Sequence, residues 1–223
     1  MIAGVDGCRD GWIAVVELDG GRTEIRRPVG IQELLEDREL KLIVMDIPIG
    51  LTDKGSREAD TSARAFLQKR ACCVFPAPIR PIINCDSWEE ACRVSFATDG
   101  KRISKQQFGI LDKVRAVDVA LRKINAGNIF EGHPEVSFAL MNDGLPLFTS
   151  KKKSAGRDCR CELLSRFFPD ANARMNEYRH HREDVLDAYA MLWTARRIKC
   201  GKARRFPPEH RSDRLGLRME IAG

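Results

Sequence analysis

Short apolar runs separated by turn residues occupy the first part of the chain. The runs IAGVDG (2–7) and GWIAVVELDG (11–20) are joined by a short turn, and their glycine and β-branched residues predict a β-hairpin. The segment RTEIRRPVG (22–30) predicts a third strand at the sheet edge, because its proline cannot donate to a ladder. Apolar residues at helical spacing follow at 31–40, and the continuous apolar run KLIVMDIPIG (41–50) predicts a strand buried on both faces.

The helix predicted between the third and fourth strands limits how these strands connect. The fourth strand cannot form a simple hairpin with the third, so we expect it to lie parallel to the first strand, with the helix crossing over. Residues of about 52–127 predict a helical insertion, including a helix that begins at Ser104, before a fifth strand at 128–131. Two further amphipathic helices are predicted at 156–169 and 182–199.

The composition is that of an ordinary globular domain. Of the 223 residues, 43% are hydrophobic, which is enough for one core, so we expect a single domain over residues 1–223. We see no leader-like segment and no apolar run of membrane length, and we therefore expect a cytoplasmic protein without membrane contact. The eight cysteines contain no C-x-x-C pair, and Cys159 and Cys161 lack the reach of a usual zinc half-site, so reduced thiols are expected.

Basic residues exceed acidic ones and cluster in two segments. The net charge of +6 permits a polyanionic partner without proving one. Most of the excess lies in KKKSAGRDCR (151–160) and RRIKCGKARR (196–205). Taken alone, these segments indicate a solvated loop and a polar helix end. They leave the oligomeric state open.

Two aspartates stand where buried strands are predicted. Asp6 lies inside the first strand, and Asp46 ends the apolar part of the fourth. If these strands are neighbours, the two carboxylates lie a few ångströms apart, and burying two like charges is costly without a counter-ion. Mg²⁺ prefers carboxylate oxygens, so the pair predicts a divalent cation site.

The last predicted helix carries a second acidic pair. Asp184 and Asp187 are three positions apart and share one face, which continues with Ala188 and Met191 and therefore points inward. An acid in the first turn can simply complement the helix dipole, an interpretation that fits Asp184 better than Asp187. Glu131, at the end of the fifth predicted strand, adds another carboxylate.

The segments that carry these acids belong to a longer series of motifs. The motifs are GVDGCRDGWIAV, MDIPIGL, READTSARAFL, VFPAPIR, SKQQFGILDKVRAVD, EGHPEVSF, KKKSAGRDCR and DVLDAYA. In this order, from about residue 3 to residue 195, the chain resembles a widespread uncharacterised family of predicted nucleases with an RNase H-like fold, and DRLGLRMEI near the end is a further match. The resemblance implies an α/β fold with a mixed five-stranded sheet in the order 3-2-1-4-5, strand 2 antiparallel, flanked by helices.

The resemblance also implies a function and a set of site residues. It implies two-metal hydrolysis of phosphodiester bonds with Mg²⁺ or Mn²⁺, acting on nucleic acid or another phosphodiester. The residues that it assigns as metal ligands and catalytic groups are Asp6 and Asp46, Asp187 or Asp184 from the last helix, and Glu131 as a fourth acid. The acidic pair on the last helix resembles that of Holliday-junction resolvases. Nucleases of the RNase H type proper use an acid from the helix before the fourth strand, here Glu33 or Glu36, which fit less well.

Basic residues in the same motifs are candidates for substrate contacts. The residues assigned to substrate binding are Arg57, Arg64, Arg80, His133, Lys152, Lys153 and Arg160. Arginine and lysine can clamp a phosphate, and a proline-rich loop can hold an arginine rigidly toward a ligand. The competing interpretations are surface salt bridges for the arginines on the predicted helix and a structural role for the histidine. Glu135 could cap a helix or support the site, and Trp12 and Phe75 are expected in the core.

Two other classes of function share parts of this pattern. A nucleotide phosphotransferase or ATPase of the actin and sugar-kinase type has the same core, and DGCRDG (6–11) imitates its phosphate turn, but such enzymes usually duplicate that core. A non-catalytic nucleic-acid-binding scaffold would be expected to have lost one of the acids. The sequence leaves open whether the substrate is DNA or RNA, and whether cleavage is internal or terminal.

Overall fold

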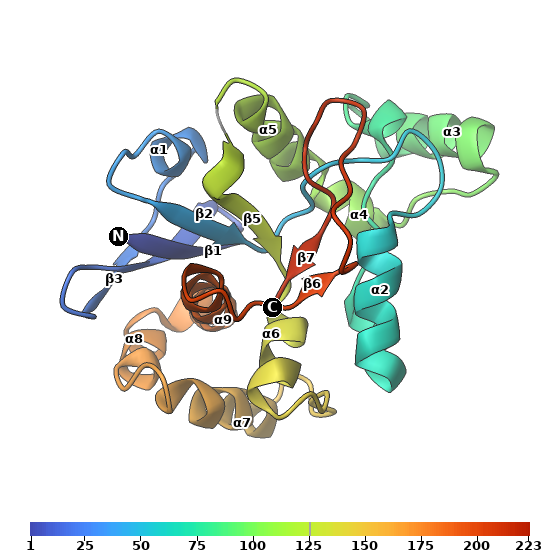
Figure 1. Ribbon diagram of the computed structural model, residues 1–223. Helices are drawn as coiled ribbons and strands as arrows, with labels where there is room; N and C mark the ends of the chain where they lie inside the picture. Colours follow the sequence, from blue (N-terminus) through green and yellow to red (C-terminus); the bar gives the residue numbers. More distant parts are fainter. Residues whose placement is uncertain (125) are drawn as a thin grey trace.

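A mixed sheet of seven strands forms the centre of the computed structural model, which describes residues 1–124 and 126–223 (Figure 1). The strands are β1 (Ile2–Cys8), β2 (Gly11–Glu17), β3 (Thr23–Arg26), β4 (Leu42–Met45), β5 (Ile129–Gly132), β6 (Arg205–Phe206) and β7 (Ile221–Ala222). Their order in the sheet is β3-β2-β1-β4-β5-β7-β6. Strand β2 is antiparallel to β1, whereas β4 and β5 continue in parallel from β1.

The first five strands therefore follow the predicted order 3-2-1-4-5, but the prediction of only five strands is wrong. Strand β7 pairs in parallel with β5, and β6 pairs antiparallel with β7, so both extend the sheet beyond its predicted edge. Each of these strands has two residues, which is too short to leave a hydrophobic period in the sequence.

Helices cover both faces of the sheet and fill the connection between β4 and β5. They are α1 (Gln32–Leu35), α2 (Glu58–Leu67), α3 (Trp88–Asp99), α4 (Lys105–Gly109), α5 (Leu111–Leu121), α6 (Pro134–Met141), α7 (Ser154–Ser165), α8 (Ala171–Glu177) and α9 (Arg182–Lys199). Helix α1 is the predicted crossover, and α2 to α5 lie within the predicted insertion. The helix expected from Ser104 is split into α4 and α5 at Ile110, and Ser104 caps α4 through a capping box with Gln107.

The alternation of side chains along β1 assigns its two faces. Ala3 and Val5 pack with residues of α1 and α5, whereas Ile2 and Cys8 pack with α9 on the opposite face. Figure 1 shows α9 beneath β1 and β2, with α6, α7 and α8 outside it. Since Asp6 lies at an even position of this strand, it faces α9.

Helix α9 approaches β1 unusually closely at Gly4. A Cβ atom at Gly4 would lie 2.0 Å from the backbone nitrogen of Leu192 and 2.2 Å from the carbonyl oxygen of Ala188. No side chain fits there without moving the helix. Because Gly4 has no side chain, α9 can lie directly on the sheet. The first turns of the helix then lie over the carboxyl end of β1.

Two sequence expectations concern the chain as a whole. None of the eight cysteines, all of which lie in the described part of the chain, forms a disulfide. Within residues 1–124 and 126–223, no helix has both the length and the apolar character needed to cross a membrane.

Candidate functional site

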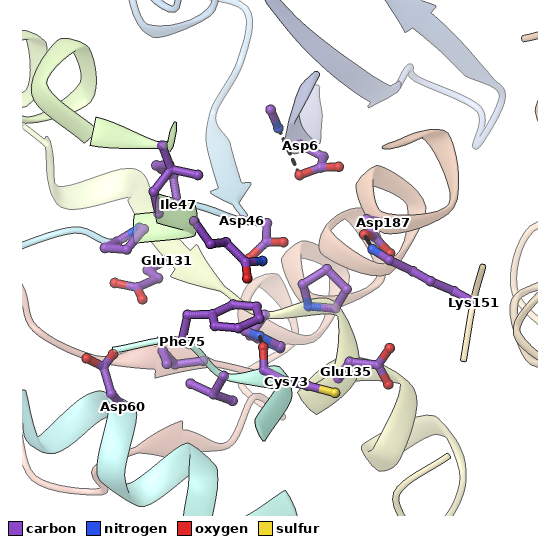
Figure 2. A pocket seen from close by; sticks show the side chains of 18 of the residues that line it. Asp6, Asp46, Ile47, Asp60, Cys73, Phe75, Glu131, Glu135, Lys151 and Asp187 are labelled. Carbon is purple, nitrogen blue, oxygen red and sulfur yellow. Dashed lines mark hydrogen bonds and ion pairs between the residues drawn. The ribbon is translucent and has the colours of Figure 1, made fainter. Parts of the chain in front are cut away.

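The carboxyl ends of β1 and β4 bring two acidic side chains together. In the parallel pair Val5 lies beside Met45, and the backbone N–H of Asp46 donates to the carbonyl oxygen of Val5 at 2.9 Å. Asp46 therefore leaves the sheet beside Asp6, as the strand order predicted. Figure 2 shows both carboxylates on the same side of the pocket, facing α9.

Helix α9 supplies the third acid of this group. Asp187 is 2% exposed, and its Oδ2 accepts a hydrogen bond from the ammonium group of Lys151, which comes from the turn before α7 (Figure 2). Its other oxygen, Oδ1, is buried and has no hydrogen-bond partner among the residues that the structure describes. We call Asp6, Asp46 and Asp187 the carboxylate cluster.

Burial and mutual repulsion disfavour the charged forms of these acids. Burial raises the pKa of Asp6 well above its ordinary value, and the charges of Asp187 and Asp46 raise it further. Burial also raises the pKa values of Asp46 and Asp187 to about 6, while Lys151 opposes both increases. The cluster therefore lacks enough positive charge to ionise fully at neutral pH.

The donor atoms and surroundings of the cluster fit a hard divalent cation. All the donors are carboxylate oxygens from three different elements, and one of them is a buried oxygen without a hydrogen bond. Mg²⁺ and Mn²⁺ prefer such oxygen ligands, and either ion would supply the missing charge. Asp6, Asp46 and Asp187 are the residues that could hold it.

Glu131 does not join the cluster, contrary to the prediction from its position at the end of β5. It lines the same pocket, but it pairs with Met45 across the parallel ladder, and Met45 faces α1 and α5, so Glu131 leaves the sheet on the other side from Asp6. There both of its carboxylate oxygens accept hydrogen bonds from Arg57, at 2.7 and 2.8 Å. Because side chains alternate between the two faces of a strand, Glu131, which was predicted as a metal ligand, instead forms an internal ion pair with Arg57.

Glu135, in the first turn of α6, lines the same pocket as the carboxylate cluster. Its negative charge raises the pKa values of Asp46 and Asp187. Both of its oxygens accept hydrogen bonds from Arg160, at 2.7 and 2.8 Å, so its position is fixed by a bidentate pair. The sequence signal was the proline at the first position of α6, which marks a helix start directly after β5.

Asp184 lies at the edge of the same pocket and has a different partner. Its Oδ2 lies 3.0 Å from Nδ1 of His181, one turn earlier on the chain. Asp184 also makes the smallest of the charge contributions that raise the pKa of Asp6. Between the two acids of α9, the structure therefore favours Asp187 as the member of the cluster.

Most of the arginines assigned to the substrate are instead buried in internal pairs. Arg57 is 2% exposed and donates to Glu131, Asp60 and the backbone of Ile49, which uses its whole guanidinium group. Arg80 forms ion pairs with two aspartates, Asp118 and Asp213. Arg160 pairs with Glu135 and has no exposed surface. Arg64 is half-buried and donates to the carbonyl oxygen of Val74 at 2.6 Å.

The pocket retains a smaller set of groups that can meet a ligand. Lys152 and His133 line it, whereas Lys153 is exposed outside it. His133 lies 3.2 Å from the carbonyl oxygen of Cys73 through Nε2, and burial lowers its pKa, which favours the neutral ring. Lys113, Arg70 and Lys151 also line the pocket but were not predicted, because each gains its position only through the fold.

Phe75 corrects an expectation about the core. It is 46% exposed and lies in the pocket, in the proline-rich loop after α2 (Figure 2). Trp12 is buried in the core as expected, with the ammonium group of Lys113 5.0 Å from its ring centre. The pocket has a volume of about 570 Å³, a size typical of sites for small organic ligands.

Fold and site together define an α/β protein with a largely buried carboxylate cluster at the end of a mixed sheet. The chain matches the family described as "Protein of unknown function (DUF429)" over residues 4–212, and it belongs to that family. No curated protein and no solved structure matches the chain.

Lys151 already places a positive charge on the cluster, and its removal is expected to have two opposite effects. Replacing Lys151 with methionine leaves Asp187 buried without its ion pair, which should lower the free energy of unfolding by about 1–3 kcal/mol. The affinity for Mg²⁺ or Mn²⁺ should rise, because the cation no longer has to displace the ammonium group. Urea denaturation and calorimetric titration measure the two quantities.

The neighbouring lysine is a suitable control for this substitution. Lys152 is exposed, so Lys152→Met should change stability by less than about 0.5 kcal/mol. An unchanged metal affinity in Lys151→Met would show that the ammonium group does not occupy the cation position.

Proposed function

We propose that this protein is a metal-dependent phosphodiesterase of the RNase H-like class that cleaves nucleic acid. The observation that carries the proposal is the convergence of Asp6, Asp46 and Asp187 on one pocket, all three with raised carboxyl pKa values. The strand order β3-β2-β1-β4-β5, with β2 antiparallel, supports the RNase H-like assignment, as do acids at the ends of β1 and β4 and on the closing helix.

The electrostatics of the pocket support a cation between protein and substrate. Carboxylates outnumber the lysines and arginines that line it, and Arg57 is already paired with Glu131 and Asp60. A phosphodiester would be repelled from such a surface. Bound Mg²⁺ or Mn²⁺ would neutralise the acids and stabilise the negative charge that grows on the phosphate and the leaving oxygen.

The residues that line the pocket have different roles in the proposed reaction. The carboxylate cluster binds the cation, and Glu135, held by Arg160, is positioned to orient a water molecule. Lys113 and Lys152 on the pocket wall attract the phosphate backbone. The exposed ring of Phe75 offers an apolar surface to a base or sugar next to the scissile bond.

Cleavage assays with and without metal test this proposal. Labelled single-stranded and duplex DNA and RNA, together with bis(p-nitrophenyl) phosphate, are incubated with the protein in millimolar Mn²⁺ or Mg²⁺, or in EDTA. We expect metal-dependent cleavage of at least one substrate. Asp46→Asn should reduce the rate by about 100-fold or more, which corresponds to several kcal/mol of lost transition-state stabilisation.

An exposed aspartate provides the matched control. Asp53 forms a surface pair with Arg214, so Asp53→Asn should leave the rate unchanged. The proposal fails if the wild-type protein cleaves none of the substrates, or if Asp46→Asn cleaves as fast as the wild type.

A further inference from the structure

Three side chains of different chemistry meet beside the carboxylate cluster, where β1 ends and α9 begins. Cys8, His181 and Asp184 each offer one ligand atom, and these atoms all lie within 4.8 Å of one another. Cys8 is buried, and the side chains of His181 and Asp184 are 14% and 28% exposed. The group is thus shielded from water but open on one side.

The fold itself produces this meeting. Cys8 lies two positions after Asp6 on β1 and therefore faces α9 as well. His181 and Asp184 are three positions apart at the start of α9 and lie on one face, with Nδ1 and Oδ2 3.0 Å apart. Residues separated by more than 170 positions in the chain are brought together by the packing of one strand against one helix.

The donor set differs in kind from that of the carboxylate cluster. A thiolate, an imidazole and a carboxylate provide sulfur, nitrogen and oxygen, a combination that suits Zn²⁺ and does not suit Mg²⁺. In a tetrahedral zinc site, ligand atoms at about 2.0–2.3 Å from the ion lie roughly 3.3–3.8 Å apart. The ligand atoms of Cys8, His181 and Asp184, which lie within 4.8 Å of one another, can reach these distances by rotation of the side chains.

A second cavity reaches two of these ligands, His181 and Asp184. This cavity has a volume of about 400 Å³ and is lined by His181, Asp184, His180, Arg157 and other residues around the start of α9. Arg157, Arg179 and Arg182 also line this cavity, which has room for a water molecule beside His181 and Asp184.

We propose that Cys8, His181 and Asp184 form a Zn²⁺ site with three protein ligands and one open position. On binding, the S–H bond of Cys8 breaks and a sulfur–zinc bond forms, with the thiol proton passing to the solvent. Asp184 binds in its ionised form, and the ring of His181 binds in its neutral form. The site does not depend on the proposed phosphodiesterase activity, because it uses none of the three residues of the carboxylate cluster.

Arg27 acts against this site in the metal-free protein. Its guanidinium group lies 3.0 Å from Nε2 of His181, and because an arginine can only donate, Nε2 accepts and the proton sits on Nδ1, toward Asp184. Nδ1 is the ring nitrogen that faces Asp184, and zinc bound there requires the other tautomer, with a proton on Nε2 that Arg27 cannot accept. Arg27 is exposed and can rotate away, but it must do so before the ion binds.

Cobalt spectroscopy and zinc calorimetry test the proposal on the whole chain. Under reducing conditions, Co²⁺ bound at this site should give a thiolate-to-cobalt absorption band in the near ultraviolet, and Zn²⁺ should displace it. Cys8→Ser should abolish the band, and His181→Ala should weaken Zn²⁺ binding by about 100-fold, as expected for the loss of a ligand. Arg27→Gln should strengthen binding, because the amide oxygen of glutamine can accept the Nε2 proton.

Matched variants separate this site from the other thiols and imidazoles. Cys73→Ser and His180→Ala should keep the band and the zinc affinity, since neither residue belongs to the group. The proposal is overturned if the wild-type protein gives no band, if the band survives Cys8→Ser, or if Cys73→Ser removes it. Cleavage in Mg²⁺ is measured in parallel, so that a failure of the phosphodiesterase proposal is recognised separately.

Discussion

Replacing Asp6 with asparagine is expected to make the metal-free protein more stable and to abolish its binding of Mg²⁺ or Mn²⁺. Asparagine keeps an oxygen that can accept the N–H of Gly7, a bond of 2.8 Å in the wild type. It removes a buried charge whose ionisation is opposed by burial, Asp187 and Asp46. A raised carboxyl pKa means that the folded state pays to hold this charge, so the free energy of unfolding at neutral pH should rise.

The pH dependence of stability provides a second measure of the same repulsion. The pKa values of Asp46 and Asp187 are raised to about 6 in the folded chain, above an unfolded value of about 4. The folded state binds more protons between these two pH values, so the free energy of unfolding of the metal-free protein should fall as the pH rises through this range. Divalent cation binding should show the opposite trend and weaken as the pH falls below about 6.

Urea denaturation from pH 4 to 8, with and without millimolar Mg²⁺, measures both effects. The wild type should gain stability from Mg²⁺, whereas Asp6→Asn should not. Asp10 is exposed in the turn of the same hairpin, so Asp10→Asn should behave like the wild type. If Asp6→Asn were less stable than the wild type without metal, the carboxylate would have a structural role and the cation site would lose its main support.

The substitution Arg57→Met should cause the largest loss of stability in the molecule. Its guanidinium group lies between two buried acids, Glu131 and Asp60, and also donates to the carbonyl oxygens of Ile49 and Gly50. Methionine fills a similar volume but leaves both carboxylates buried without their partner. Breaking such a buried pair costs about 3–5 kcal/mol, so we expect a decrease of that size in the free energy of unfolding.

A surface arginine that pairs with the first turn of α2 gives the comparison. Arg211 pairs with Glu58 at the start of α2, and both side chains are about half exposed. Arg211→Ala should therefore cost less than about 1 kcal/mol. If Arg57→Met were equally mild, the pair with Glu131 would not be the main bond between α2 and β5, and Glu131 could again be considered as a metal ligand.

The sequence predicted those features of the fold that depend on local periodicity. The continuous apolar run before Asp46 and the hairpin around Asp6 were enough to place two acids at adjacent strand ends. Helical spacing predicted only that Asp184 and Asp187 share an inward face, and it did not decide between them. Each of these predictions rested on a local hydrophobic pattern, with a period of 2 residues for a strand or 3.6 residues for a helix.

The features that were missed depend on contacts between distant segments. No local pattern shows that Arg57 meets Glu131, or that Arg80 meets Asp213 near the end of the chain. Glu131 looked like a site residue because its strand end was predicted correctly but the face of the strand was not. Phe75 looked like a core residue because it is apolar, although no helix or strand of the described chain covers it fully.

The close approach of α9 at Gly4 has a consequence for ion selectivity. Because the backbone of the helix rests directly on the backbone of β1, the acids carried by these two elements cannot move apart to fit a larger ion. Ca²⁺ needs oxygen ligands at about 2.3–2.6 Å and usually more of them, whereas Mg²⁺ accepts about 2.0–2.1 Å and keeps several waters. The contact at Gly4, two positions before Asp6 and against Ala188 next to Asp187, would thus favour the smaller ion.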